Sequence, residues 1–161
     1  MDAAETRPPS LLALPSYLAG NVARIGHRLL LGALAENELR LAHFAVLVGL
    51  SDFGPLAQHE LADRLDINRS HLVGYVDHIE QRGLVRRDRD PADRRRQRVA
   101  LTAAGRALLR DLRPVAERSQ AEFLQVLSKS ERQTLLVLLR RVLDASDEAR
   151  LADRGPPRAA G

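Results

Sequence analysis

Residues 68–102 constrain the fold more than any other stretch, because their pattern changes from helical to alternating. Asn68 is a favourable N-cap, since its side chain can accept a hydrogen bond from an amide of the first helical turn. Apolar residues follow at the spacing of one helix face: Leu72, Val76 and Ile79, with Tyr75 beside them. Gly83 stands where such a helix would end, at a position that favours a positive φ. The pattern predicts a helix that begins at Arg69 and stops before Gly83.

The chain then alternates between apolar and charged residues, which is typical of short strands. Residues 84–86 predict a first strand and residues 98–101 a second. Between them, residues 90–93 (Asp-Pro-Ala-Asp) supply residue types that favour a turn. A short helix followed by a two-stranded hairpin with a basic tip indicates a winged helix.

Positive charge is concentrated in this part of the chain. Residues 82–98 contain eight Arg and three Asp, a net charge of +5, whereas the whole chain carries +4. The rest of the chain therefore sums to −1, and such focusing is what contact with a polyanion such as nucleic acid requires. An arginine-rich turn can also be no more than a solvated loop, but its position behind a capped helix favours the nucleic-acid interpretation.

The composition limits the alternatives. A chain of 161 residues, 45% of them hydrophobic, can form one folded domain, or one domain with a dimerisation extension. The absence of Cys excludes disulfides, cysteine zinc sites and thiol-based redox sensing. No apolar run reaches membrane-spanning length, and residues 1–5 do not resemble a signal peptide, so we expect a soluble, cytoplasmic protein with no membrane partner.

Helical patterns also occupy the sequence before Asn68. We expect a first helix from about residue 15 to residue 35, a second over residues 40–50, and a turn at residues 51–55. A short helix over residues 58–66 then leads through a tight turn into the helix that begins at Arg69. Two short helices joined in this way form a helix-turn-helix.

The C-terminal part predicts two further helices. Thr102 can cap a long helix from residue 103 to about residue 127, and residues 128–131 (Ser-Lys-Ser-Glu) form a capping box that opens the last helix. Residues 135–139 of that helix are apolar almost all round and must be buried on more than one side. We therefore expect a second subunit to cover them, in an obligate dimer built from the first and last helices. The alternative is an intramolecular bundle that uses these apolar positions itself.

Together these patterns predict a mostly α-helical fold with a small β-hairpin wing. The expected division is a disordered N-terminus at residues 1–9, a helical dimerisation region at residues 10–37 and 103–148, a winged helix-turn-helix DNA-binding domain at residues 38–102, and a disordered tail at residues 149–161. No constellation of side chains indicates catalysis or a bound cofactor, so we expect neither.

Four short runs in the sequence resemble the MarR family of bacterial transcription regulators. They are residues 61–65 (LADRL), 76–85 (VDHIEQRGLV), 90–95 (DPADRR) and 101–105 (LTAAG). The resemblance covers about residues 39–143, and it implies a winged-helix dimer that binds a pseudo-palindromic site and is often released by a small ligand. It also implies that the helix from Arg69 is the recognition helix, that Arg95 reaches into the minor groove, and that Asp93 braces Arg95.

The sequence departs from the family pattern at two helix N-termini and on the recognition helix. Arg40 and Ala57 stand where Ser or Thr caps are usual. Val73 and Gly74 stand where polar or basic residues often face the DNA. Gly74 offers no side chain to a base, although it allows a closer approach of the backbone.

The candidate DNA contacts come from the helix and from the hairpin. They are Asn68, Arg69, Ser70, His71, Gly74 and His78 on the helix, and Arg86, Arg94, Arg95 and Arg96 on the hairpin. The first residues of a helix in the major groove reach base edges, and a guanidinium fits a narrow minor groove. Arg86, Arg87 and Arg89 alternate along a strand, so they cannot all face the DNA. Ordinary surface polarity is the alternative for the helix residues.

Histidines support two further hypotheses. His27 and His43 fall in the first two helices, and by the resemblance they lie near a ligand cleft, where they could contact an acidic or phenolic effector. The alternative is that both are ordinary core or interface histidines.

Residues 59–63 (His-Glu-Leu-Ala-Asp) miss the metalloprotease pattern H-E-x-x-H by one residue, so we expect no metal there.

We therefore expect a homodimeric repressor that binds double-stranded DNA, with a small-molecule effector as a further partner. The rival hypothesis is a ligand-independent architectural protein that binds DNA with little sequence preference.

Overall fold

The computed structural model describes residues 7–153 and confirms a mostly helical fold with a two-stranded hairpin. Its helices are α1 (Pro9–Leu12), α2 (Pro15–Leu34), the 3-10 turn η2 (Ala35–Asn37), α3 (Leu41–Phe53), α4 (Gln58–Leu65), α5 (Arg69–Gln81), α6 (Ala103–Phe123) and α7 (Lys129–Asp153). The strands are β1 (Val85–Arg89) and β2 (Gln97–Leu101). The chain divides into two compact units, one that ends at Phe123 and one that begins at Leu124.

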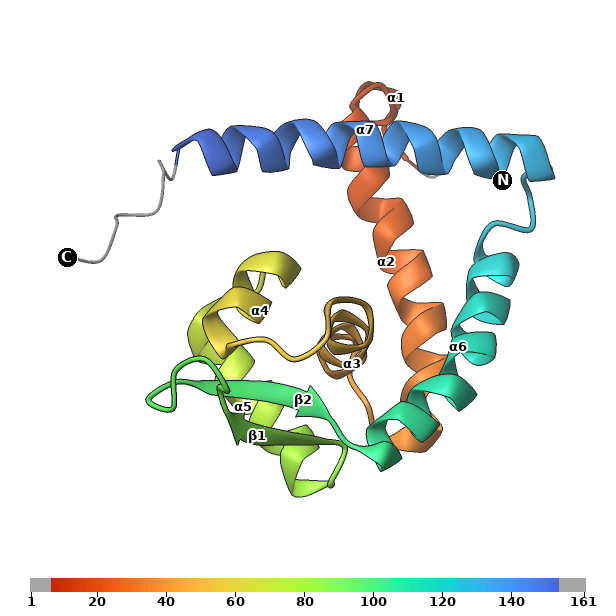
Figure 1. The fold of residues 1–161 in the computed structure, drawn as a ribbon. Coiled ribbons are helices and arrows are strands. Elements are labelled where there is room, and N and C mark those ends of the chain that lie inside the picture. The colour runs from red at the N-terminus through yellow and green to blue at the C-terminus, as the bar shows by residue number, and fades with distance from the viewer. Residues whose placement is uncertain (1–6, 154–161) are drawn as a thin grey trace. The chain divides into compact units, whose positions relative to one another are not determined.

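Helices α3, α4 and α5 and the hairpin form the winged helix-turn-helix of the first unit (Figure 1). Helices α4 and α5 both pack against α3, and so do α2 and α6, which lie side by side (Figure 1). The strands pair antiparallel, with Arg87 opposite Val99. A single bridge adds Leu56 to this sheet: its N–H donates to the Val99 carbonyl at 3.2 Å, and the Val99 N–H donates back at 2.8 Å. We did not predict this bridge, because one paired residue leaves no alternating pattern.

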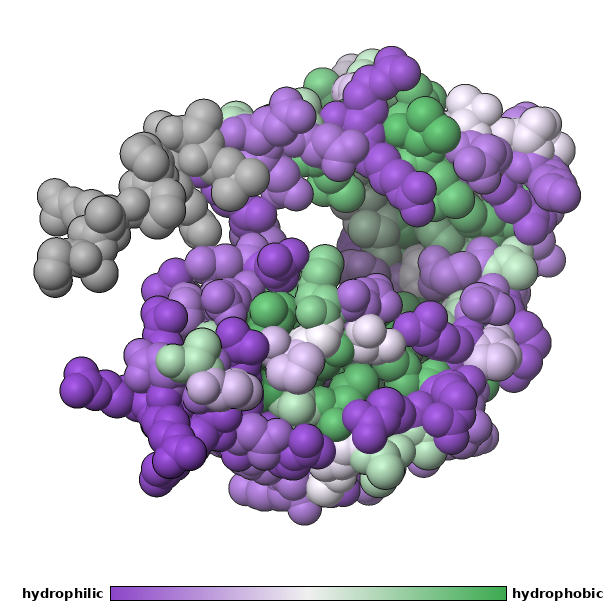
Figure 2. Space-filling model, viewed as in Figure 1, coloured by the Kyte–Doolittle hydropathy of each residue, from purple (hydrophilic) through white to green (hydrophobic). Residues whose placement is uncertain are grey.

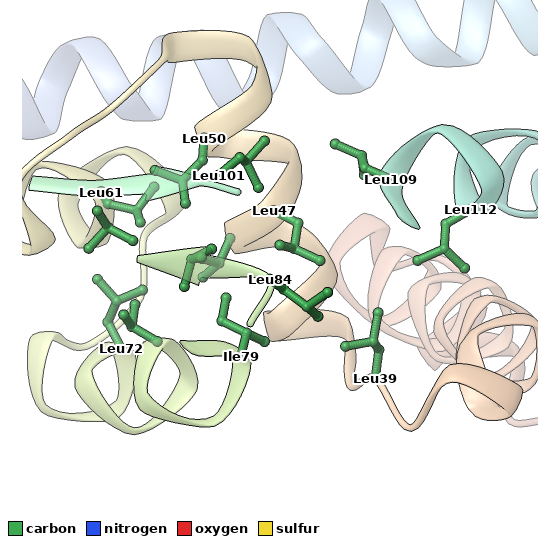
Figure 3. Packing of buried hydrophobic residues seen from close by; sticks show 14 of the residues in the cluster. Leu39, Leu47, Leu50, Leu61, Leu72, Ile79, Leu84, Leu101, Leu109 and Leu112 are labelled. Carbon is green, nitrogen blue, oxygen red and sulfur yellow. The ribbon is translucent and has the colours of Figure 1, made fainter. Parts of the chain in front are cut away.

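One hydrophobic core joins the helix-turn-helix to the hairpin and to α6 (Figure 3). Its most buried side chains include Leu47 from α3, Leu61 from α4, Leu72, Val76 and Ile79 from α5, Val85 and Val99 from the hairpin, and Leu112 from α6. The predicted apolar stripe is thus the buried face of α5. Burial of each such side chain contributes about 1.5–3 kcal/mol, so the core fixes which face of α5 remains outside.

Both ends of α5 have the caps that the sequence predicts. The Asn68 side chain accepts the N–H of Ser70 at 2.9 Å. At the other end, Gly83 has a φ of 70°, and its N–H donates to the Glu80 carbonyl at 2.8 Å. The N–H of Leu84 donates to the Ile79 carbonyl at 3.0 Å. This pair of bonds is the Schellman arrangement, which favours a residue without Cβ at the left-handed position.

The unusual N-caps of α3 and α4 are compensated from the third position of each helix. The backbone N–H of Arg40 donates to Nδ1 of His43 at 3.1 Å, and that of Ala57 donates to a carboxylate oxygen of Glu60 at 3.0 Å. In each case a side chain reaches back to the amide before the helix, which is half of a capping box. The departures from the family pattern at these positions therefore do not leave the amides unpaired.

Several element boundaries differ from the prediction. Helix α3 continues to Phe53, through most of the expected turn at residues 51–55, and stops where Gly54 adopts a φ of 78°. Strand β1 extends to Arg89, because its residues stay paired with β2. Helix α6 ends at Phe123, earlier than predicted.

The two ends of the described chain are more helical than we predicted. Pro9, in the expected disordered N-terminus, begins helix α1. A proline suits the first helical position because its φ is preset and it lacks an amide that would go unpaired. Helix α7 runs to Asp153, so residues 149–153 are helical rather than part of a disordered tail. Residues 1–6 and 154–161 lie outside the described residues.

Helix α7 begins with the predicted capping box. The Ser128 N–H donates to the Glu131 carboxylate at 2.7 Å, and the Glu131 N–H donates to Ser128 Oγ at 3.3 Å. Its exposed apolar side chains are Leu136, Val137, Leu138, Leu139, Val142 and Leu143. No helix within residues 7–153 combines the length and the apolar character that crossing a membrane requires.

Gly105, the glycine of the LTAAG run, lies in the first turn of α6. A Cβ on this residue would stand 2.0 Å from the carbonyl oxygen of Leu84. We expect Gly105→Ala to lower the free energy of unfolding by about 1–3 kcal/mol, the usual cost of overpacking, as measured by urea denaturation. Gly74→Ala in α5, whose Cβ would meet open space, is the matched control and should be neutral or stabilising. An unchanged unfolding midpoint for Gly105→Ala would contradict the prediction.

Candidate nucleic-acid interface

Polar residues at the start of α5 are exposed to solvent. Arg69, Ser70, His71 and Gly74 lie on the exposed side of the helix, away from its buried face. The Asn68 side chain is occupied by the cap, where it accepts both the N–H and the hydroxyl of Ser70. A helix with an exposed N-terminal turn and a firmly buried opposite face is suited to insertion into the major groove.

Arg69 forms an ion pair with Asp63 of α4 at 3.0 Å, and 64% of its side chain is exposed. An exposed pair of this kind contributes only about 0–1 kcal/mol. The guanidinium can therefore exchange this carboxylate for a phosphate or a guanine edge at little cost.

The hairpin tip carries three exposed arginines, Arg94, Arg95 and Arg96. The turn is closed by the Asp90 N–H, which donates to the Arg96 carbonyl at 2.9 Å. Asp93 contacts Arg95 through the backbone, because its carboxylate accepts the Arg95 N–H at 3.0 Å. The Arg95 guanidinium remains exposed, and the tip forms a hydrophilic projection (Figure 2).

Asp90 has a structural role in the wing where we predicted only a turn residue. It is 6% exposed, and its side chain accepts the Ala92 N–H at 2.8 Å and pairs with Arg98 at 2.8 Å. The Ala92 N–H, and to a smaller extent Arg98, lowers the pKa of Asp90, so the carboxylate stays ionised. An Asp whose side chain bonds an amide two residues later is an Asx turn, a pattern that could have revealed this role.

The other arginines of the hairpin stretch do not join one DNA-facing surface. Arg86 pairs with Asp88 at 2.6 Å and lines a small cavity beside the end of α3 and the start of α6. It therefore lies apart from α5, and the structure does not bring this predicted DNA contact together with those of the helix. Arg82 donates to the backbone carbonyl of Asn37, and Arg98 pairs with the carboxylate of Asp90. Within residues 7–153, no ion pair is found for Arg89, Arg94, Arg95 or Arg96.

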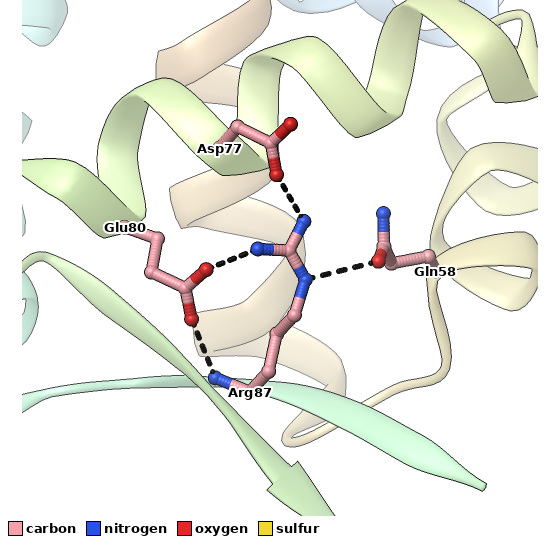
Figure 4. A network of polar contacts seen from close by, with 4 residues as sticks. All are labelled: Gln58, Asp77, Glu80 and Arg87. Atoms are coloured by element: carbon pink, nitrogen blue, oxygen red, sulfur yellow. Dashed lines mark hydrogen bonds and ion pairs between the residues drawn. The ribbon is translucent and has the colours of Figure 1, made fainter.

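Arg87 points from β1 towards α5 (Figure 4). Its guanidinium pairs with the carboxylates of Asp77 and Glu80, and its Nε donates to the side-chain oxygen of Gln58 at 3.1 Å. Its backbone N–H also donates to Glu80, at 2.9 Å. The Arg87 side chain is 19% exposed and joins β1 to both α4 and α5. The amide nitrogen of Gln58 is buried and has no partner among the described residues.

A cavity of about 570 Å³ lies between α5 and the start of α3. Its lining residues are Glu38, Arg40, His43, Ser70, His71, Gly74, Tyr75 and His78. Four of them, Ser70, His71, Gly74 and His78, are also predicted DNA contacts. His78 therefore borders the same cavity as the predicted DNA contacts at the start of α5, and His43 lines this cavity from α3.

His43 is 4% exposed and stacks on His78, with ring centroids 4.5 Å apart, while Tyr75 meets the ring at an edge. Burial, followed by the nearby charges of His78 and Arg40, lowers the pKa of His43 to about 4. The imidazole is neutral near pH 7, and because its Nδ1 accepts the Arg40 N–H, its proton is on Nε2. His27, the other predicted ligand contact, is exposed on α2 and does not line this cavity.

The run at residues 59–63 does not assemble a metal site. His59 is exposed, Glu60 is engaged in the cap of α4, and Asp63 pairs with Arg69. No group of three or more suitable ligands comes together in the part of the chain that the structure describes.

Comparison with known sequences points to regulators of transcription. The sequence model of the MarR family matches residues 39–96. The transcriptional repressor NicR of Pseudomonas putida is 34% identical to this chain over 114 residues, which make up 71% of this chain and 72% of NicR.

Solved structures of similar proteins share the fold. BpsR from Bordetella bronchiseptica, whose DNA binding is regulated by 6-hydroxynicotinic acid, superposes with a TM-score of 0.76 at 27% identity, over 82% of this chain and 94% of BpsR. A mutant of MarR from Escherichia coli, complexed with operator DNA, superposes with a TM-score of 0.73 at 27% identity, over 80% of this chain and 92% of that one. The likeness covers most of both proteins in each pair.

The neutral state of His43 predicts a pH-dependent stability. Its pKa is about 4 in the folded protein, against 6.5 for an ordinary histidine, so the unfolded chain takes up the proton first as the pH falls. We expect the free energy of unfolding to be highest above about pH 6.5 and to decrease between pH 6.5 and pH 4, as measured by urea denaturation. His43→Asn should flatten this part of the profile. An equal slope in the variant and the wild type would contradict the assignment.

Proposed function

Because the chain belongs to the MarR family of transcription regulators, we propose that it is a homodimeric repressor that binds a pseudo-palindromic operator. The protein is a DNA-binding transcription regulator. The observation that carries the proposal is the exposed N-terminal half of α5 next to a wing with exposed tip arginines. Action in the cytoplasm, on chromosomal DNA, is part of the same proposal.

In the proposed complex, α5 enters the major groove, where Arg69, Ser70 and His71 reach base edges or phosphates. The wing extends to the adjacent minor groove, where Arg95 is attracted by the negative potential of a narrow, A·T-rich segment. Arg94 and Arg96 contact phosphates. Each phosphate contact weakens as salt rises, because binding releases counterions from the DNA.

Regulators of this family act as dimers, and exposed apolar residues support the same assembly for this chain. On α2 these are Leu18, Val22, Ile25 and Leu31, and on α7 they run from Leu136 to Leu143. Apolar faces of this extent are normally covered, and a second copy offers a matching surface under two-fold symmetry. We assign dimerisation to residues 10–37 and 103–148, so that two copies of α5 address two half-sites.

A small acidic ligand suits the cavity beside α5. Arg40 supplies a positive charge for a carboxylate, and the rings of His43, Tyr75 and His78 supply surfaces for an aromatic ring. The similarity to BpsR, which responds to 6-hydroxynicotinic acid, supports a ligand of this class. A ligand that prefers a conformation other than the DNA-bound one lowers DNA affinity by shifting the population.

The second candidate is an architectural protein that binds DNA with little sequence preference. It is favoured by Val73 and Gly74, which place no polar side chain in the middle of the exposed face of α5. The two candidates differ in the DNA that they prefer, so one titration separates them.

Anisotropy titrations with the DNA upstream of the protein's own coding sequence and with a scrambled duplex test the proposal. The upstream DNA should bind more tightly by on the order of a thousandfold at physiological salt. Arg95→Ala should weaken that binding by about 1–3 kcal/mol, while light scattering still shows a dimer.

Arg113→Ala is the matched control for Arg95→Ala, because it also removes one positive charge but at a position outside the proposed DNA contacts. Arg113 pairs with Asp52 at 3.4 Å, between α6 and α3. Equal affinity for both duplexes, with equally steep salt dependence, would favour the architectural protein instead. Unchanged affinity in Arg95→Ala would remove the wing from the mechanism.

Ligand release can be tested with a panel of aromatic acids that includes 6-hydroxynicotinate. A compound that binds the cavity should raise the melting temperature of the free protein and weaken its binding to the operator duplex. Both responses should disappear in Arg40→Met, which lacks the charge that we assign to the carboxylate. A response that persists in Arg40→Met would place the ligand elsewhere, and a panel without any response would contradict this ligand class.

A further inference from the structure

We propose that Arg87 is a positioning residue for DNA binding, which holds the wing in the orientation that lets the wing and α5 contact adjacent grooves together. The inference rests on the proposed function, and specifically on contact of Arg95 with the minor groove. A rigid link between the two DNA-contacting elements matters because a small change of angle at the base of the hairpin becomes a larger displacement at its tip.

The Arg87 guanidinium contacts three side chains from two helices, a cluster that we call the Arg87 joint (Figure 4). Its two terminal nitrogens face two different carboxylates of α5, Asp77 and Glu80, and its Nε faces Gln58 in the first turn of α4. A guanidinium is planar and rigid, so three separate partners fix its orientation as well as its position. The backbone N–H of the same residue donates to Glu80 at 2.9 Å, which also ties the strand itself to α5.

Arg87 does not supply charge to the DNA. Its side chain is 19% exposed, and two carboxylates neutralise it. The wing-tip arginines, by contrast, are exposed. Loss of the Arg87 guanidinium should therefore alter DNA binding through geometry and not through a missing phosphate contact.

Apolar packing does not by itself define the angle of the hairpin, and the backbone bridge between Leu56 and Val99 ties β2 to the segment before α4 and not to α5. Val85 and Val99 anchor the base of the hairpin in the core, but hydrophobic contact is not directional. Without Arg87, Asp77 and Glu80 would also face each other as like charges three residues apart on α5. Arg87 thus supplies the directional side-chain contact between β1 and α5, in addition to the backbone bonds at the base of the hairpin, and relieves a repulsion on the recognition helix.

The test compares Arg87→Met with the wild type on two duplexes that share the same operator core. The long duplex includes the flanking segments that the wings reach, and the short one ends before them. Methionine keeps the aliphatic stem and removes the guanidinium. We expect Arg87→Met to lose about tenfold in affinity for the long duplex, within the range for residues that act through others. The short duplex should bind the variant and the wild type alike.

Two further variants separate positioning from a general loss of stability. In a background of Arg95→Ala, Arg87→Met should cause a clearly smaller further loss on the long duplex, because the minor-groove contact of Arg95 is already gone and only the phosphate contacts of Arg94 and Arg96 remain to be misplaced. Arg113→Met removes one positive charge from a more exposed ion pair and should leave both duplexes unaffected. Circular dichroism melts confirm that every variant is folded at the assay temperature.

Each outcome decides the inference. Equal losses on the long and the short duplex, additive losses with Arg95→Ala, or no loss at all would overturn it. If Arg95→Ala itself binds the long duplex as the wild type does, the proposed wing contact fails and this inference fails with it. A loss in Arg95→Ala without a loss in Arg87→Met would remove the positioning role alone.

A second variant covers the case in which Arg87→Met does not fold. Glu80→Gln keeps the shape of the side chain and an oxygen that can accept the Arg87 N–H, but it removes one charge from the joint. It should show the same pattern at smaller size, with a loss confined to the long duplex. Loss on both duplexes in this variant would overturn the inference.

Discussion

The backbone carbonyl of Leu84 is the point at which α5, the hairpin and α6 meet. The Thr102 N–H donates to it at 3.1 Å, and the Thr102 hydroxyl lies within hydrogen-bond distance of it and of the Gly83 carbonyl. The same hydroxyl oxygen accepts the Gly105 N–H at 3.0 Å, which starts α6. Only a residue without Cβ at position 105 leaves room for this approach. The run LTAAG is therefore a junction, and α6 cannot move freely from the end of the recognition helix.

Among the arginines of residues 82–98, electrostatics distinguish two sets with different tasks. Arg87 pairs with Asp77 of α5 and so holds the wing to that helix. Arg98 pairs with Asp90, which lies within the wing, and so stabilises the hairpin itself. The arginines at positions 94–96 are exposed at the tip. A net charge counted along the sequence therefore overstates the charge that the wing offers to DNA, because part of it is neutralised within the fold.

Features that depend on neighbouring residues were predictable. The caps at Asn68, Gly83 and Thr102 and the capping box at Ser128 each involve a bond between residues a few positions apart, so local sequence was enough. The bridge at Leu56 was not predictable, because it depends on a partner far along the chain.

The same limit applies to the candidate site. Alternation along β1 predicted that its arginines could not all face the DNA, but only the packing of α4 and α5 decides that Arg87 points inward. The joint of Arg87 with Gln58, Asp77 and Glu80 assembles three elements and has no local signature. The sequence suggested both His27 and His43 as ligand contacts because they fall in the first two helices. Only His43 lines the cavity.

The cavity beside α5 is lined by Ser70, His71 and Gly74, which also form the proposed DNA-facing turn of the helix. In the proposed function, one short segment thus borders two recognition surfaces. Gene duplicates that diverge at these positions would change their promoter preference and their chemical signal in a single step.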